Sequence, residues 1–373
     1  MATWFRISIS SVLVAGMGCY SDGQSPTQLT DVSTHFAGIV TVGTCDSPQV
    51  SVHFLGDCDH DEVQINAAIA SVQDGGGVVK LLPGTYDLQR SDSVGAVVIS
   101  RSDIVLEGSG PSTRLVLADH QNVNAVAIHG LDIKRVVVRD LYVNGNRFKN
   151  NPSEGSSQPR DPWDNSGIRA KPFNGSIPED IRVENCWVEE SYRLNIQLIA
   201  INAVISDCWL GDATMDVAEI IIGPGRISNN FVEIDGVTGY GLGTDKADDV
   251  IIESNQVVVR DGGRITQEVF RFWPHHQNNA LISNSVRVEE EGYVEQFVRL
   301  AGRNNIMSGN QFYSNRLHTK IVIEGPATVV NANLFANTHV IVDQKISGDE
   351  PILIYGNVWI NSPLTVLNGR VNP

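Results

Sequence analysis

Short apolar stretches alternate with glycine, asparagine and aspartate along most of the chain, and one small pattern recurs among them from about Val138 onward. The pattern is an apolar residue, two mostly polar residues, an Asn or Cys, one further residue and a second apolar residue. Examples are Val183-Glu-Asn-Cys186-Trp-Val188 and Ile227-Ser-Asn-Asn230-Phe-Val232. No helix-length periodic segment separates the copies, so each copy predicts strands joined by turns.

The central Asn or Cys of each copy, here called the anchor, recurs at intervals of 22 to 30 residues. Such a period is typical of a solenoid, whose units bury their apolar edges against each other. We therefore predict an all-β fold, a single-stranded parallel β-helix that occupies residues 96–373 as one domain. Leucine-rich repeats have a similar period, but this chain lacks their leucines and their convex helix. The predicted anchors are Cys186, Cys208, Asn230, Asn255, Ser285, Asn310, Asn333 and Asn357, with Arg287 as a misfit in the apolar slot after Ser285.

Stacking gives the anchors a physical role. Asn side chains at the same place on neighbouring coils can hydrogen-bond to one another and to the backbone of a tight bend. Cys186 and Cys208 fit that place as small buried thiols better than as a redox or metal pair. The residue after each anchor should point outward, in a column that could bind sugar rings, seal a subunit interface or lie under the protein's own loops. This column contains Tyr142, Trp187, Trp209 and Phe231.

The segment ahead of the coils has a different pattern. Residues 61–73 predict an amphipathic helix with acidic residues in its first turn, ended by three glycines at 75–77. A helix laid across the first coil would protect the open apolar end of the solenoid. We therefore expect residues 46–95 to be a capping segment.

Two interpretations stay open for residues 1–45. Phe5, Ile7 and Ile9 alternate with polar residues, which favours a strand or docking segment. The alternative is a secretory signal region near the N-terminus. No stretch of the sequence reaches the roughly 20 apolar residues of a membrane-spanning helix, so no integral membrane protein is expected.

The charge of the chain bears on its expected partners, and its cysteines bear on metal binding and disulfide bonds. The chain has 43 acidic and 27 basic residues, a net charge of -16, and no run of Lys or Arg. Nucleic acid is therefore not an expected partner. The five cysteines show no zinc-ligand spacing. Cys45 and Cys58 are close enough in sequence to close a small disulfide loop, and the sequence alone leaves this open.

Several motifs near the start resemble the opening of pectate-lyase-superfamily β-helices. They are Cys58-Asp-His-Asp-Glu-Val-Gln-Ile-Asn-Ala-Ala-Ile69, Gly75-Gly-Gly-Val-Val, Leu82-Pro-Gly-Thr-Tyr86, Ile104-Val-Leu-Glu-Gly108 and Asp140-Leu-Tyr-Val-Asn-Gly-Asn146. The resemblance implies a right-handed parallel β-helix. Similar openings occur in phage tail spikes and other virion-associated proteins, in secreted polysaccharide lyases and in mannuronan epimerases. It therefore implies a polysaccharide partner, a homotrimer, and a place on a virion, beside other virion proteins, or outside the cell.

The resemblance carries over no complete catalytic set. The epimerases place Tyr-Gly and Asp-Pro-His-Glu soon after the Asn-Gly-Asn loop, whereas this chain has Glu190-Ser-Tyr192-Arg-Leu-Asn-Ile-Gln197, where only the tyrosine corresponds. Polygalacturonases carry Asn-Thr-Asp, Asp-Asp, Gly-His-Gly and Arg-Ile-Lys in order. This chain offers only Asp248-Asp249 and Arg264-Ile265-Thr266. We therefore exclude a polygalacturonase.

Candidate chemistry lies on the strand that precedes each anchor segment, because active members of the superfamily use that face as a sugar groove. Alternation predicts outward side chains that mix cations, amides and carboxylates, a combination suited to an acidic glycan. For each residue, an ordinary solvated strand face is the competing explanation. The predicted outward residues are Arg169, Lys171, Asn195, Gln197, Glu219, Asp245, Arg271 and Arg299.

The type of reaction decides which of these residues would act. Lyase or epimerase chemistry needs a cation for the uronate carboxylate and a base for the ring proton; the candidates are Arg169, Lys171, Tyr192, Arg271 and His275. Hydrolysis needs two carboxylates about 5 to 9.5 Å apart; the candidates are Asp212, Asp216, Glu219 and Asp245. Sugar rings could stack on Trp163, Trp187, Trp209 and Trp273.

Three functional hypotheses follow. The first is a virion-associated or secreted β-helix protein that binds, and could depolymerise, surface polysaccharide. The second is a structural virion or surface component without catalysis, and the third is a secreted polysaccharide lyase or uronan epimerase. No cofactor is expected; scattered acidic residues could hold Ca²⁺, although no consecutive ligand motif supports it.

Overall fold

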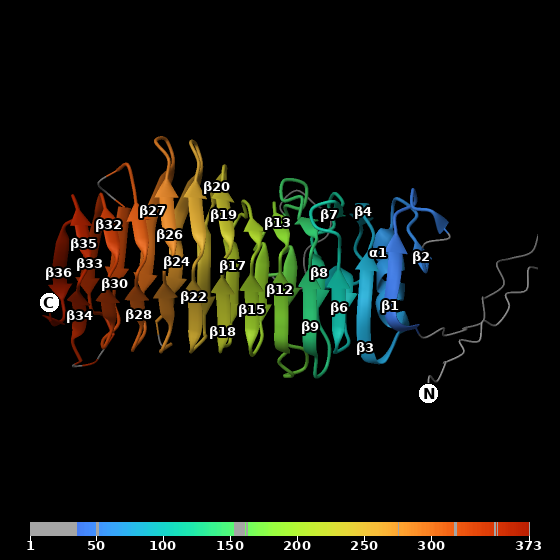
Figure 1. Ribbon diagram of the computed structural model, residues 1–373, viewed down its shortest axis with the longest axis horizontal. Helices are drawn as coiled ribbons and strands as arrows, with labels where there is room; N and C mark the ends of the chain where they lie inside the picture. The colour runs from blue at the N-terminus through green and yellow to red at the C-terminus, as the bar shows by residue number, and fades with distance from the viewer. Residues whose placement is uncertain are drawn as a thin grey trace, which may run out of the picture. The chain divides into compact units, whose positions relative to one another are not determined.

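The protein winds into a stack of coils, each built from three short strands and three turns (Figure 1). The computed structural model describes residues 36–49, 52–152, 161, 163–274, 276–316, 319–346, 348 and 350–372. The alternating strand predicted near Phe5 and the alternative signal region lie outside these residues. Corresponding strands of successive coils pair in parallel and form three long sheets, here called A, B and C. The predicted all-β parallel β-helix is confirmed.

The chain visits the sheets in the order A, B, C in every coil. Sheet A contains β2 (Phe54–Leu55), β1 (Phe36–Gly43), β3 (Val72–Leu81), β6 (Ile104–Glu107), β9 (Lys134–Arg139), β12 (Glu179–Glu184), β15 (Ala203–Ser206), β18 (Gly225–Ser228), β22 (Val250–Glu253), β25 (Ala280–Ile282), β28 (Ile306–Ser308), β31 (Val329–Asn331), β34 (Ile352–Tyr355) and β37 (Val371–Asn372). The ladder thus reaches back to β3 and β1, ahead of residue 96, where the sequence placed the start of the β-helix.

Sheets B and C complete each coil. Sheet B contains β4 (Gly84–Leu88), β7 (Thr113–Leu117), β10 (Tyr142–Asn144), β13 (Trp187–Glu189), β16 (Trp209–Leu210), β19 (Phe231–Ile234), β23 (Gln256–Val259), β26 (Ser285–Val288), β29 (Gln311–Tyr313), β32 (Leu334–Ala336) and β35 (Val358–Ile360). Sheet C contains β5 (Gly95–Ile99), β8 (Asn124–Ile128), β11 (Ile168–Ala170), β14 (Ile196–Ile199), β17 (Asp216–Ile221), β21 (Tyr240–Asp245), β24 (Arg264–Phe272), β27 (Tyr293–Leu300), β30 (Thr319–Ile323), β33 (Thr338–Asp343) and β36 (Leu364–Asn368), with β20 (Val237–Thr238) also paired to β24.

The core lies inside the coils, where alternate residues of each strand point inward. Val183, Ile205, Ile227 and Ile252 pair in register on successive sheet A strands, and all four are fully buried. The next residue in this column is Leu281. Each inward position is therefore covered by the equivalent residue of the next coil, as expected for a solenoid.

The Asn anchors form a hydrogen-bonded ladder at the turn from sheet A to sheet B. Asn230 Nδ2 donates to Asn255 Oδ1 (2.9 Å), and Asn255 Nδ2 donates to Asn284 Oδ1 (2.9 Å). Asn284 continues to Asn310, and the ladder then reaches Asn333 and Asn357. Each amide also donates to a backbone carbonyl of the preceding coil, for example Asn284 Nδ2 to Ile252 O (2.9 Å). The ladder thereby satisfies the buried polar groups of a tight bend.

One anchor was predicted wrongly. The ladder uses Asn284, whereas Ser285 was the predicted anchor. With this one-residue shift Val257 pairs with Val286, so the apolar slot is filled by Val286 and Arg287 points outward. The apparent misfit at Arg287 was therefore an error of alignment, because two neighbouring polar residues fit the repeat and only the amide can continue the ladder.

Cysteines replace asparagine at two anchors. Cys186 and Cys208 are buried free thiols on neighbouring coils. The Cys208 backbone N–H donates to Asn230 Oδ1 (2.9 Å), and its thiol donates weakly to Ser206 O (3.2 Å). Burial raises the pKa of the Cys186 thiol, which keeps it protonated. This placement agrees with the role predicted for them as small buried thiols.

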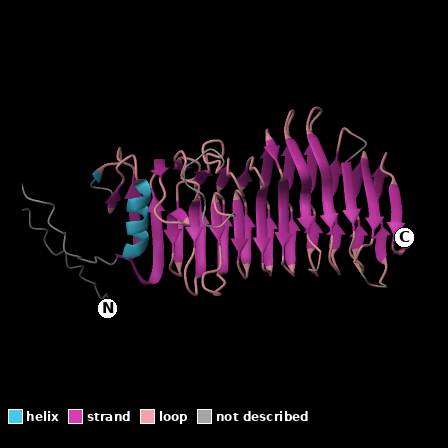
Figure 2. Ribbon diagram, turned by 180° about the vertical axis from the view of Figure 1, so that it is seen from behind, coloured by secondary structure: helices cyan, strands magenta, loops and turns pink. Residues whose placement is uncertain are grey.

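A single helix closes the start of the stack among the described residues (Figure 2). This is α1 (Asp61–Ser71), predicted over residues 61–73, which buries Ile65, Ala68 and Ile69. Asn66 donates to Ala96 O (2.8 Å) and accepts from Val98 N (2.8 Å), so its amide pairs with β5 as a neighbouring strand would. The helix therefore protects both the apolar end and the exposed edge of the first coil.

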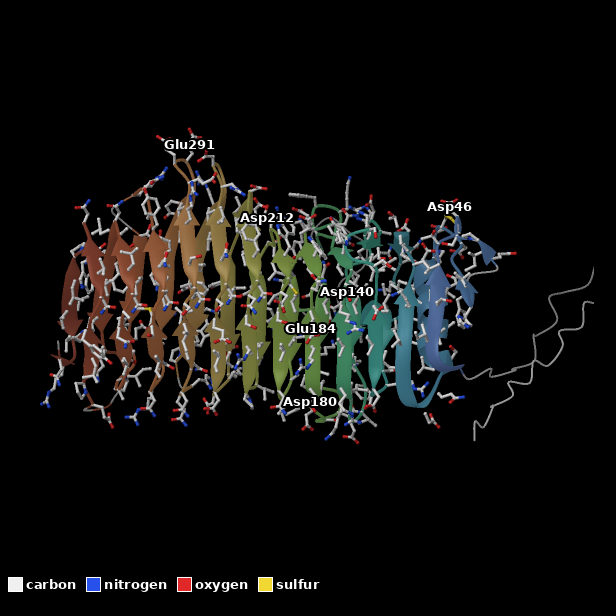
Figure 3. All side chains as sticks on the ribbon, in the orientation of Figure 1. Asp46, Asp140, Asp180, Glu184, Asp212 and Glu291 are labelled. Carbon is white, nitrogen blue, oxygen red and sulfur yellow. A yellow bond between two sulfur atoms is a disulfide. The ribbon has the colours of Figure 1, made fainter. Side chains whose placement is uncertain are left out.

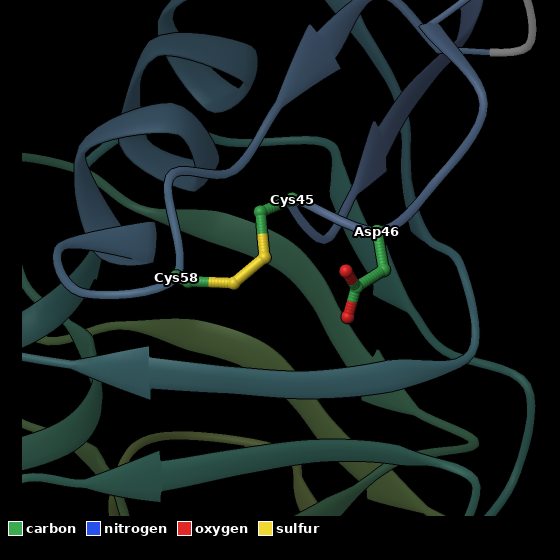
Figure 4. A group of neighbouring side chains, drawn as sticks. All are labelled: Cys45, Asp46 and Cys58. Carbon is green, nitrogen blue, oxygen red and sulfur yellow. A yellow bond between two sulfur atoms is a disulfide. The ribbon is translucent and has the colours of Figure 1, made fainter.

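A disulfide joins Cys45 to Cys58 beside this helix (Figure 4). Their Cα atoms are 5.4 Å apart, within the usual range for a disulfide. Asp46 lies close to both sulfurs, and these three residues are the one described group whose atoms lie near enough to share a metal ion. The sulfurs are bonded to each other, so they are not available as thiolate ligands.

Charged side chains cover the outer face of sheet A and the turns beside it, including Asp140, Asp180 and Glu184 (Figure 3). Many pair across neighbouring coils, as Lys134 Nζ does with Glu179 Oε2 (2.6 Å). Exposed pairs of this kind contribute little to stability individually. Across the described chain, the helix is too short to cross a membrane.

Candidate functional site

A row of polar side chains crosses the outer face of sheet C. Parallel register places one residue from each successive strand in a single column. The column combines cations, an amide and a carboxylate on adjacent coils, as alternation predicted. Its members are Arg169, Gln197, Glu219, Gly243, Arg271 and Arg299.

Three predicted members of this row lie elsewhere, and one of them is Lys171, which is two residues beyond Arg169. Asp245 stands in a second column with Ile199 and Ile221, because the register pairs Glu219 with Gly243. Asn195 is fully buried at the turn before β14, where its Nδ2 donates to Gly211 O (2.8 Å). Asn195 therefore holds a bend together and is not available to a ligand.

A cleft of about 540 Å³ opens over these columns. The segment between β10 and β11 forms one of its walls through Asp161 and Trp163. Its lining combines charged, aromatic and aliphatic side chains. The lining residues are Asp161, Trp163, Arg169, Pro172, Gln197, Ile199, Met215, Asp216, Glu219, Ile221, Ile222, Tyr240, Asp245, Lys246, Arg271 and Trp273.

A chain of hydrogen bonds and ion pairs runs along the base of the cleft. Arg169 Nε donates to Gln197 Oε1 (2.7 Å), and Gln197 Nε2 donates to Glu219 Oε2 (3.0 Å). Arg271 Nη2 donates to Glu219 Oε1 (2.7 Å) and makes an ion pair with Asp216 Oδ1 (2.7 Å). All five side chains are at least nine-tenths buried. Two carboxylates thus share one guanidinium nitrogen in a site largely shielded from water.

Gly243 makes this arrangement possible. It occupies the position between Glu219 and Arg271 in the column, so no side chain separates the two residues. A Cβ at this position would lie 3.2 Å from Arg271 O and 3.4 Å from Arg271 Cβ. The missing side chain leaves the path along which Arg271 reaches across two coils to Glu219.

Aromatic rings hold the Arg271 guanidinium from two directions. Its Cζ atom lies 4.0 Å from the centre of the Tyr240 ring and 5.4 Å from that of Trp273. The Arg299 Cζ atom lies 4.9 Å from the same Trp273 ring. Cation–π contacts of this kind are strongest when they are desolvated, as they are for Arg271. Arg271 is therefore fixed in position before any ligand arrives.

Burial changes the acidity of Asp216. Burial first, and then the nearby charge of Glu219, raise the pKa of Asp216 to about 8, although the Arg271 guanidinium acts in the opposite direction. Asp216 therefore carries a proton at neutral pH. Glu219 accepts hydrogen bonds from both Gln197 and Arg271.

The cations at the other end of the cleft are already paired. Arg169 Nη1 contacts Asp164 Oδ1 (2.6 Å) and Asp161 Oδ2 (3.1 Å). Lys171 Nζ contacts Asp164 Oδ2 (2.9 Å) and Asp161 Oδ2 (3.6 Å). Asp164 is fully buried. A neighbouring hollow of about 470 Å³, which includes His129, extends the cleft past Lys171.

The remaining sequence candidates lie apart from the shared Arg271 contact. Trp187 and Trp209 pair in register on sheet B, a different face of the coils, together with Tyr142 and Phe231. The four aromatic residues stand in one column, in which Tyr142 is buried, and Trp187 and Trp209 do not line the cleft. Tyr192 stacks with Arg193 (5.3 Å) before β14, outside the lining.

Three further candidates complete the set. Arg299 extends the column but pairs with Glu324 (3.0 Å). Asp212 belongs to a separate buried cluster, where it contacts Arg147 Nη2 (3.3 Å) and accepts from Gly236 N (2.9 Å). His275 lies outside the described residues.

The sequence pattern did not point to Tyr240 or Gly243. Gly243 could have been found by continuing the column in strict register from Glu219 to Arg271. Tyr240 carried no such signal, because it contacts Arg271 from the start of its strand.

The sequence matches no protein-family model and no curated protein. Solved structures resemble the fold. A DFA-IIIase from Arthrobacter chlorophenolicus has a TM-score of 0.58 at 15% identity, with 89% of this chain and 86% of that chain covered. The A-module of a mannuronan C-5 epimerase from Azotobacter vinelandii has a TM-score of 0.55 at 15% identity, with 84% and 96% covered. A mannuronic acid specific polysaccharide family 6 lyase from human gut microbiota has a TM-score of 0.55 at 15% identity, with 80% and 73% covered. The chain therefore shares the fold of these structures, a right-handed parallel β-helix.

Proposed function

We propose that the sheet C cleft binds a polysaccharide and that Asp216 and Glu219 cleave a glycosidic bond in it. The observation that carries this proposal is the pair of buried carboxylates that contact the same nitrogen of Arg271. A buried acid with a raised pKa beside a second carboxyl group is a common arrangement for acid–base chemistry. The named activities of the fold neighbours, which act on sugars, are consistent with a carbohydrate ligand.

The two carboxylates have separate roles in this proposal. Asp216, protonated at neutral pH, gives its proton to the glycosidic oxygen as the bond to the anomeric carbon breaks. The Glu219 carboxylate attacks the same carbon and forms a glycosyl ester. Water then attacks the ester, its proton passes to Asp216, and Glu219 is released as a carboxylate.

The short separation of the carboxylates favours this two-step route. Each lies 2.7 Å from Arg271 Nη2, so the contacting oxygens are no farther apart than twice that distance. Direct attack by water requires roughly 6.5 to 9.5 Å between the carboxyl groups, whereas the two-step reaction uses about 5 to 5.5 Å. The geometry therefore supports cleavage with retained configuration at the anomeric carbon.

Lyase or epimerase chemistry is less well supported. Both reactions require a cation that neutralises the carboxylate of a uronate sugar. Arg169, Lys171 and Arg271 are the predicted cations, and all three already contact carboxylates of the protein. Tyr192, the predicted base that corresponds to the epimerase motif, lies outside the cleft.

Activity measurements on two variants test the proposal. Asp216→Asn and Glu219→Gln should each reduce cleavage of a polysaccharide substrate by at least about a hundredfold. Glu295→Gln, a carboxylate on sheet C that pairs with Lys320 away from the cleft, should stay within about twofold. New reducing ends report hydrolysis and ultraviolet absorbance reports unsaturated lyase products. Unsaturated products, or full activity in both cleft variants, would contradict the proposed reaction.

The setting of the protein is part of the same proposal. We infer a virion-associated or extracellular location, in the manner of the tail spikes that the opening motifs resemble, with trimeric assembly. The Cys45–Cys58 disulfide supports an oxidising environment. Mass spectrometry of the native N-terminus and light scattering test this: an intact Met1 would argue against signal cleavage, and a monomeric mass would overturn the trimer.

A further inference from the structure

We infer that the sugar residues bound beside Asp216 and Glu219 are uncharged, so the ligand of the sheet C cleft is a neutral glycan. This inference rests on the proposed function and names the substrate class of the same site. It departs from the acidic glycan that the row of basic residues suggested in the sequence.

The first observation is that each buried cation of the cleft already contacts two acidic side chains of the protein. Arg169 is 2% exposed and contacts both Asp161 and Asp164. Arg271 is 4% exposed and contacts both Asp216 and Glu219. A uronate entering the cleft would have to compete with carboxylates that are already desolvated and paired, which is costly for the groups left behind.

The second observation is the charge of the lining as a whole. Four carboxyl groups, those of Asp161, Asp216, Glu219 and Asp245, face three cations, those of Arg169, Lys246 and Arg271, and with Asp216 protonated the lining has no excess of positive charge. The pKa of Asp216, raised to about 8, reports that the site already disfavours one of its own negative charges. A further carboxylate from a ligand would add to this repulsion.

The third observation concerns a buried donor without a hydrogen-bond partner among the described residues, Arg271 Nε. Asp216 Oδ1 beside it already contacts Arg271 Nη2 (2.7 Å). A sugar hydroxyl can accept a hydrogen bond from Nε, so this contact requires no charge on the ligand.

The floor of the cleft is apolar beside these groups. Ile199 and Ile221 pair in register and are partly exposed, with Trp163 and Trp273 at the sides. Aliphatic and aromatic surfaces bind the C–H faces of sugar rings, whose burial does not depend on charge. These surfaces complete a site for an uncharged ring.

Binding measurements with matched polymers test the inference. Asp216→Asn is the suitable inactive variant, because an amide keeps the charge of the protonated acid. We expect it to bind a fully methyl-esterified polygalacturonate, or a neutral mannan or fructan, at least about tenfold more tightly than polygalacturonate or alginate. We also expect the affinity for the neutral polymer to change less than about twofold between low and high salt.

A second pair of variants tests the physical cause. Asp161→Asn removes a carboxylate from Arg169 and Lys171 and should raise the affinity for polygalacturonate or alginate several-fold. Asp207→Asn makes the same charge change at an exposed turn between sheets A and B, where Asn fits the positive φ of 57°, and should leave that affinity unchanged.

The outcomes separate the inference from the proposed function. Preferential, salt-sensitive binding of the uronate polymers, with cleavage still lost in Glu219→Gln, would overturn the neutral ligand and leave the proposed function intact. Binding of none of these polymers, or binding unaffected by bulky substitution of Gly243, would count against the proposed function itself.

Discussion

Asp216, the acid of the proposed reaction, also affects the stability of the protein. Its pKa, raised to about 8 by burial and by Glu219, means that the folded protein keeps this proton at pH values where the unfolded chain has released it. The folded state therefore binds more protons than the unfolded state between about pH 4 and pH 8. The contribution of Asp216 to the free energy of unfolding therefore falls as pH rises through this window and is greatest below it.

Replacing Asp216 should remove this dependence. We expect Asp216→Asn to become more stable relative to the wild-type protein as the pH rises from about 5 to about 9. Chemical denaturation midpoints of both proteins across this range provide the measurement. A constant difference between the two midpoints would show that Asp216 titrates alike in the folded and unfolded states.

The Asn ladder yields a second prediction at single residues. Asn284 makes hydrogen bonds with Asn255, Asn310 and two backbone carbonyls, and all of them are buried except the partly buried one to Ile282 O. Asn284→Ala should cost roughly 2 to 4 kcal/mol, because several buried groups lose their partners. Ser285→Ala, one residue later, should cost less than about 0.5 kcal/mol. Thermal or chemical unfolding of both variants checks this; the reverse order would restore Ser285 as the anchor.

At the scale of elements, α1 stabilises the first coil through its side chains. Asp61 Oδ2 accepts from Asp87 N (2.9 Å) and Glu62 Oε2 accepts from Gln89 N (2.9 Å), just as Asn66 pairs with β5. These acids were predicted from the sequence as favourable charges at a helix N-terminus. The structure adds that they satisfy backbone groups of β4 and of the residue that follows it, groups with no preceding coil to pair with.

The edge contact of Asn66 can be tested directly. Asn66→Ala should cost about 1 to 3 kcal/mol and should speed amide hydrogen exchange at Val98, whose N–H then loses its acceptor. Val63→Ala, at an exposed position of the same helix, is the control and should leave exchange at Val98 unchanged. Equal exchange in both variants would mean that Asn66 does not protect the edge.

For the whole molecule, the sequence predicted the fold far better than the site. The repeat determined which residues face inward and outward, because each coil is packed only against its neighbours. The column Arg169, Gln197, Glu219 and Arg271 followed from that alternation alone. The ion pairs of Arg169 could not be predicted from the alternation, because Asp161 and Asp164 contact it from a loop that does not follow the repeat. The expected acidic glycan was inferred from cations whose partners the sequence could not reveal.

Because each coil is packed only against its neighbours, the stability of variants is best measured coil by coil. In a solenoid, contacts between neighbouring coils provide most of the stability, so unfolding can proceed in parts. Loss of a ladder residue in a central coil therefore acts on both flanking segments. Local probes, such as amide exchange in the affected coil, are more informative here than a single global midpoint.

Gly243 has a consequence for recognising activity in chains of this architecture. Another protein of this fold could keep acids equivalent to Asp216 and Glu219 but have a branched residue in place of Gly243, which would displace the guanidinium of the equivalent of Arg271. That protein would have both acids and would still lack the proposed activity. An inventory of acidic residues is thus a poor guide to chemistry in stacked coils, and the smallest residue of the column is the more informative marker.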